Sequence, residues 1–112
     1  MAVKITKVDP AEIDTGQISD VDIIGEGLDR AGLEAFVMDY AGENIDTSIG
    51  VGQPIPDDIS ANRFPVTIDV PEKAKEGDRN IGIKLKGEEL KDGECDKKST
   101  TCYILKDGIK LK

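Results

Sequence analysis

Short runs in which apolar and polar residues alternate recur along this chain. The clearest are residues 66–70 (VTIDV) and residues 81–86 (IGIKLK). A period of two places the apolar side chains on one face of a β-strand. No segment shows a convincing helical period. We therefore predict an all-β fold, an immunoglobulin-like antiparallel β-sandwich of about seven to eight strands.

Turn-forming residues divide the chain into these strands. Asp9-Pro10 ends or bends the first strand, and Gly25 and Gly27 permit a bulge or a tight exit. A long Pro-rich connection follows residue 52, and an Asp107-Gly108 turn is expected between two final strand pieces. Residues 72–76 could form one helical turn. The expected strands are residues 3–8, 21–23, 33–40, 45–51, 66–70, 81–85, 102–105 and 109–111.

Composition supports one folded domain over residues 1–112, which we expect to be part of a longer chain. Apolar residues make up 38% of the 112 residues and aromatic residues 4%, so we expect a thin, aliphatic core. The net charge of −8 argues against binding to a nucleic-acid backbone. No apolar run approaches the roughly 18 residues of a membrane span, so we expect no membrane insertion by this segment.

Two cysteines, Cys95 and Cys102, have six residues between them. This spacing fits neither a CxxC redox pair nor a four-ligand zinc site. It suits a disulfide across the mouth of a short loop, and a disulfide implies an oxidising compartment. We therefore expect an extracellular or cell-surface setting, whereas free thiols would indicate the cytoplasm.

Catalytic signatures are weak. The chain has no His, which removes the commonest general base and every Ser-His or Cys-His arrangement. We expect no enzyme activity, no cofactor and no metal. The residues that could bind calcium instead of lying in plain polar loops are Asp57 and Asp58, or Glu26 and Asp29, but they lack the ligand spacing of an EF-hand.

The predicted strand 33–40 departs from one-sided alternation. If Leu33, Ala35 and Val37 face the core, Phe36, Met38 and Tyr40 lie on the outer face, where strands usually carry polar groups. These three residues are our candidate partner-binding patch. Two alternatives remain open. The register could be reversed, or a loop could cover the outer face.

Several segments in order resemble the IPT/TIG type of immunoglobulin-like domain. They are VDPAEIDTG, VDIIGEGL, VTIDVPEKAKEGDRNIGIKLKG and ILKDGIKLK. The family pattern has no equivalent of residues 88–101, which carry Cys95, and this chain lacks its Gly-Gly pair before Val21. The matching residues are Val8, Pro10, Gly16, Val21, Ile23, Gly25, Gly27, Leu28, Val70, Pro71, Gly77, Gly108 and Ile109.

The resemblance implies a spacer or adhesion unit of a cell-surface protein, or a dimerisation unit of an intracellular regulator. The acidic charge and the cysteine pair favour the cell surface. We expect a non-catalytic structural or adhesive module that is monomeric in isolation and contacts neighbouring domains of its chain or another surface protein. The alternative is a protein-recognition domain that binds a dedicated partner through an outer sheet face, since GLEAFVMDYAGENI is similar to cohesin-type sandwiches.

Overall fold

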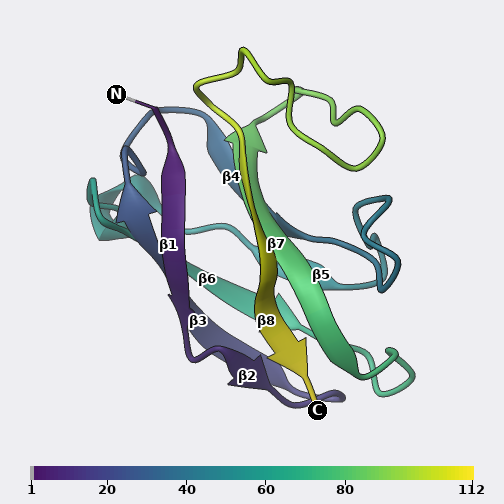
Figure 1. Cartoon of the computed structure of the whole chain (residues 1–112). Coiled ribbons are helices and arrows are strands. Elements are labelled where there is room, and N and C mark those ends of the chain that lie inside the picture. Colours follow the sequence, from purple (N-terminus) through teal and green to yellow (C-terminus); the bar gives the residue numbers. More distant parts are fainter. Residues whose placement is uncertain (1) are drawn as a thin grey trace.

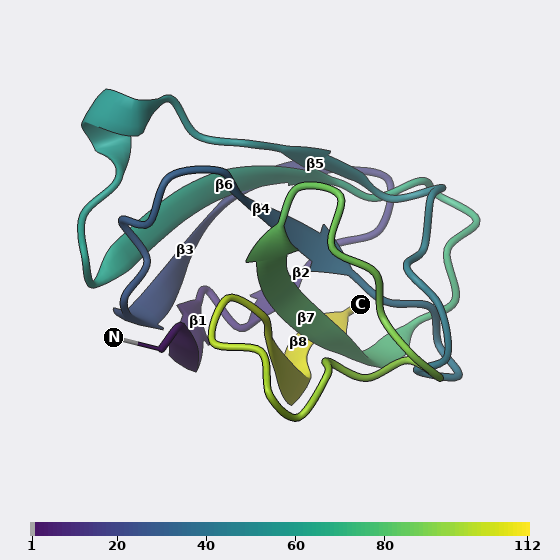
Figure 2. The same cartoon turned by 90° about the horizontal axis from the view of Figure 1, so that it is seen from above.

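The computed structural model describes residues 2–112, which form eight β-strands and one short 3₁₀ turn (Figure 1). Two four-stranded sheets pack against each other, as Figure 2 shows from above. The elements are β1 (Lys4–Asp9), β2 (Glu12–Ile13), β3 (Ile18–Glu26), β4 (Leu33–Val37), β5 (Gly50–Gly52), η1 (Pro56–Asp58), β6 (Arg63–Asp69), β7 (Gly77–Leu85) and β8 (Tyr103–Leu111).

The strand order is that of an immunoglobulin-like sandwich. One sheet has the order β1-β3-β6-β5 and the other β2-β8-β7-β4. If β1 and β2 are counted as two parts of one first strand, the first of these orders becomes first, second, fifth and fourth strand. Immunoglobulin constant-type domains have a four-stranded sheet in this same order. All pairs are antiparallel except β2 with β8, which is parallel. The predicted fold class is confirmed.

The first predicted strand changes sheets at the proline. β1 pairs with β3, and after the cis bond between Asp9 and Pro10 the short β2 pairs with β8. Gly25 lies within β3 opposite a register shift in β1. A Cβ atom at Gly25 would lie 1.9 Å from the carbonyl oxygen of Lys4, so only glycine lets the two backbones approach this closely.

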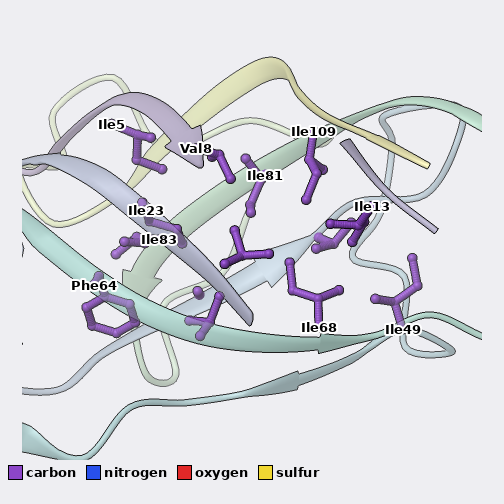
Figure 3. Packing of buried hydrophobic residues seen from close by; sticks show 14 of the residues in the cluster. Ile5, Val8, Ile13, Ile23, Ile49, Phe64, Ile68, Ile81, Ile83 and Ile109 are labelled. Carbon is purple, nitrogen blue, oxygen red and sulfur yellow. The ribbon is translucent and has the colours of Figure 1, made fainter. Parts of the chain in front are cut away.

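The core lies between the two sheets and is mostly aliphatic (Figure 3). Val21, Ile23 and Ile68 come from one sheet, and Ile81 and Ile83 come from the other. Phe64 is the one aromatic side chain among the buried members of this cluster in residues 2–112. The expected thin, aliphatic core is therefore present, and alternation along each strand supplies it.

The predicted boundaries are wrong in the last strand. Residues 102–111 do not form two pieces around a turn, because both halves pair with β7 in one continuous strand, β8. Arg79 pairs with Ile109 and Ile81 with Leu105, so the extra residues of β8 form a bulge. Asp107 adopts a φ of 53° in this bulge, and a short polar side chain tolerates that conformation.

Three other segments are shorter or less regular than predicted. The strand expected at 33–40 ends at Val37, because the chain turns back at Asp39, whose N–H donates to Asn44 at 2.8 Å. The strand expected at 45–51 is reduced to β5. The 72–76 segment forms turns without a helix, and the Pro-rich connection contains only η1.

Candidate functional site

Two loops, residues 38–49 and 86–102, cover the outer face of β4 and β7 in the sheet β2-β8-β7-β4, where Phe36 and Lys84 are buried. We call this region the covered face. The loops touch, since a Cβ atom at Gly93 would lie 2.5 Å from the carbonyl oxygen of Gly42 and 3.0 Å from that of Glu43. Figure 2 shows the two loops meeting beside β7. The covered face therefore includes much of the segment in which the sequence predicts a binding patch.

Phe36 and Met38 are buried beneath these loops. Ala35 and Val37 belong to the core between the sheets, so the reversed register is wrong and Phe36 points to the outer side. Its ring lies against Gly82 of β7, and the exposed fractions of Phe36 and Met38 are 4% and 0%. The expected surface patch is wrong for both residues. The loop-covered alternative is the arrangement observed.

Tyr40 is the one member of the predicted patch that is exposed, with 52% of its surface accessible. The ammonium group of Lys75 lies 3.9 Å from the centre of its ring, a cation–π contact between the 70–76 loop and the 38–49 loop. Gly77 lies directly against the ring edge. Tyr40 thus joins two loops and does not extend an apolar patch.

The predicted disulfide between Cys95 and Cys102 is present. Its Cα atoms are 5.7 Å apart, and Cys102 immediately precedes β8. The bond closes a short loop at the end of the covered face, and the chain-entropy model gives such a ring about 2–3 kcal/mol of stabilisation. Residues 95–102 are therefore fixed to the sheet at both ends.

Glu88 joins the start of the 86–102 loop to its end. Its carboxylate accepts hydrogen bonds from the Ser99 hydroxyl at 2.6 Å, the Thr101 hydroxyl at 2.8 Å and the Leu85 N–H at 3.2 Å. The Ser99 bond in particular holds the pKa of Glu88 below its ordinary value of 4.5, although partial burial opposes this, and Thr101, Leu85 and the Lys84 charge add to it.

The lowered pKa of Glu88 predicts a loss of stability in acid. Stabilisation is complete above the ordinary pKa of 4.5 and is lost as pH falls through the lower folded-state pKa. We expect the urea midpoint to fall between pH 7 and pH 3, and to fall by less in Glu88→Gln. Glu89→Gln, which removes a neighbouring carboxylate outside this network, is the control. An equal fall in wild type and Glu88→Gln would contradict the prediction.

An open hollow of 780 Å³ lies between the two loops. Its acidic side chains are Glu43, Glu88, Glu89 and Asp92, and the ammonium group of Lys84 at its edge bonds Glu34 at 3.0 Å. Within residues 2–112, no group of three or more His, Cys, Asp or Glu side chains is placed to hold a metal ion. The hollow is acidic but has no such ligand set.

The calcium candidates do not form one site. Asp57 and Asp58 lie in η1, whereas Glu26 ends β3 and Asp29 lies in the loop before β4. All four residues are exposed. The structure thus places them as surface carboxylates of two separate loops and brings no third acidic ligand to either pair.

Arg79 is a buried charged residue that sequence reasoning missed. Its side chain is 2% exposed and donates to the carbonyl oxygens of Met38 at 3.1 Å and Lys75 at 2.9 Å. It also pairs with Asp46 at 3.1 Å. The sequence did carry a signal for its burial, because Arg79 occupies the same alternating positions as the buried Ile81 and Ile83. This cluster holds the 38–49 and 70–76 loops together at the end of the sandwich.

The chain matches no protein-family model, and no curated protein matches it. Within residues 2–112 there is no helix that is long and apolar enough to span a membrane. The structure itself shows the immunoglobulin-like strand order, and the IPT/TIG resemblance rests on the motifs quoted above.

Proposed function

We propose that this chain is a non-catalytic, IPT/TIG-like structural or adhesive module of a secreted or cell-surface protein. The observation that carries the proposal is the position of the two ends. β1 begins at one end of the sandwich and β8 finishes at the opposite end (Figure 1). A domain of this kind can join its neighbours in line, which suits a spacer in a longer surface chain.

The disulfide supports the proposed setting. Disulfides persist in oxidising compartments and are rare in cytosolic proteins. Cys95 and Cys102 are bonded within a loop that Glu88 also fastens, so the bond is part of the folded structure of the covered face. We therefore propose an extracellular or cell-surface location, which agrees with the IPT/TIG resemblance.

The ionised groups that are partly or wholly buried support a structural role. Glu88 bonds loop hydroxyls, Lys84 pairs with Glu34, and Arg79 pairs with Asp46. The hydrogen bonds and ion pairs of these groups join loops and strands of the sandwich to one another. The alternative is a cohesin-like recognition domain, which rests on the run GLEAFVMDYAGENI. Phe36 and Met38 are buried and do not supply a binding surface for it, so we prefer the structural module.

Locating the native protein tests this function. An antibody against the chain should label intact cells or detect the protein in the medium, and protease added to intact cells should remove the surface signal. In denaturant without reductant, Cys95 and Cys102 should resist alkylation, and prior reduction should make both reactive. Detection in the cytoplasm with two free thiols would reject the proposal.

A further inference from the structure

The outer edge of β4 is closed by a side chain in place of a strand. β4 is the last strand of its sheet, and β7 pairs with its other side. At Ala35 the backbone N–H donates to the Gln53 side-chain oxygen at 2.8 Å, and the carbonyl oxygen accepts from the Gln53 side-chain nitrogen at 2.9 Å. The amide group thus makes the two bonds that a neighbouring strand would make.

Gln53 bonds the part of the β4 edge that has no backbone partner within residues 2–112. Next along the edge, the carbonyl oxygen of Val37 accepts from Asp46 N–H at 2.9 Å, because the 38–49 loop folds back beside β4. Ala35 lies beyond the reach of that loop. Gln53 follows β5 in the opposite sheet, so its side chain also ties the two sheets together along this side.

The edge of the other sheet is protected by different means. β5 pairs with β6 only as far as Thr67, which leaves the start of β6 without a partner strand on that side. Arg63 bonds Ser60 through both its N–H and its carbonyl oxygen on this side. Alternate residues of a strand point the same way, so Pro65 occupies the unpaired position, where it has no N–H to offer.

We propose that Gln53 keeps β4 from pairing with a second copy of this chain. The β4 edge is thus a latent self-association surface, and the Gln53 amide holds it closed. Unpaired strand edges are templates for sheet extension, and natural sheets block them. This proposal does not depend on where the module resides.

A second copy fits this edge because the pairing can be symmetric. Two β4 strands running antiparallel about Ala35 would exchange the Ala35 N–H and carbonyl bonds that Gln53 now satisfies. Ala35 has a small side chain, and Glu34 of one copy would lie opposite Phe36 of the other and not opposite a like charge.

The segment after Gln53 buries few side chains. η1 buries no residue, and Ile55 is 62% exposed. Only Ile59 of this stretch packs, partly buried, against the core. The two hydrogen bonds to Ala35 are therefore the main attachment of the segment near the middle of β4.

Gln53→Leu tests the proposal, with Gln53→Asn as a second variant that stays polar but is too short to reach both Ala35 atoms. Gln17→Leu, an exposed position on another loop, is the matched control for added apolar surface. In dilute solution, we expect hydrogen exchange of the Ala35 amide to accelerate at least roughly tenfold in both Gln53 variants. At higher concentration, sedimentation should detect a dimer in both, while wild type and Gln17→Leu remain monomeric.

Two outcomes would overturn the proposal. Unchanged exchange at Ala35 in both Gln53 variants would show that the amide does not close the edge. Faster exchange without dimerisation at millimolar concentration would show that the open edge does not accept a second copy. Circular dichroism of each variant confirms that the sandwich has folded, and neither outcome bears on the cellular location tested above.

Discussion

Replacing Arg79 with alanine should lower the free energy of unfolding by about 3–5 kcal/mol, because breaking a buried ion pair leaves its partners unsatisfied. The substitution would remove the donors to the Met38 and Lys75 carbonyl oxygens and leave Asp46 without its cation. Asp46 is only 19% exposed, so water compensates little. Urea unfolding followed by circular dichroism measures the loss.

Arg63→Ala is the matched control for the Arg79 prediction. Arg63 pairs with Asp22 at 3.0 Å, but the two side chains are 51% and 36% exposed. Exposed pairs of this kind are worth about 0–1 kcal/mol. Because a domain of this size has a total stability of about 5–15 kcal/mol, the two variants should separate clearly. Equal losses would mean that the loops at this end do not depend on the buried guanidinium.

Asp46 should contribute to the same effect in a pH-dependent way. Burial alone would raise the pKa of its carboxyl, but hydrogen bonds from Ser48 and Arg79, with the Arg79 charge, outweigh burial and lower it. The pair therefore stabilises the fold above the ordinary pKa of 3.8 and loses this contribution as pH falls through the lower folded-state pKa. We therefore expect Asp46, like Glu88, to contribute to the loss of stability in acid.

The two-sheet fold could be predicted because alternation is a local property of the sequence. In residues 66–70 and 81–85, each side chain's face follows from the period alone. The ends of the strands could not be predicted so well, because they depend on tertiary pairing. Asp107-Gly108 has the composition of a hairpin turn, yet β7 holds both flanking segments in one sheet and the pair becomes a bulge.

The candidate site could be predicted only in part, for a similar reason. The spacing of Cys95 and Cys102 is short enough to indicate their bond directly. The direction of Phe36 could not be predicted, because the pattern of residues 33–40 allows two registers. Its burial could not be predicted either, because it depends on two loops that meet through Gly42 and Gly93, far apart in sequence. Gln53 acts through Ala35, 18 residues away in sequence, and no local pattern reveals that contact. Arg79 shares the phase of Ile81 and Ile83, but its partners Met38 and Asp46 are 41 and 33 residues away and do not follow from that phase.

Gly82→Val should destabilise the protein by about 3 kcal/mol or more, because the covered face has no room for a side chain at this position. A Cβ atom at Gly82 would lie 2.3, 2.7 and 2.9 Å from three ring carbons of Phe36. The ring cannot turn outward, since Phe36 is 4% exposed beneath the loops. Thermal and urea unfolding of the variant measure the effect.

Gly50→Val is the control, because a Cβ atom there would meet only the Cβ of Asp69, at 3.4 Å, and β-branched residues suit strands. A double variant isolates the contact with the ring. Phe36→Ala alone should cost about 3–5 kcal/mol as a buried aromatic truncation. In combination with Gly82→Val the total should be well below the sum, since the new side chain then occupies the space of the ring. Additive losses, or a Gly82→Val variant as stable as Gly50→Val, would mean that Phe36 can leave the sheet and that its face is open to solvent after all.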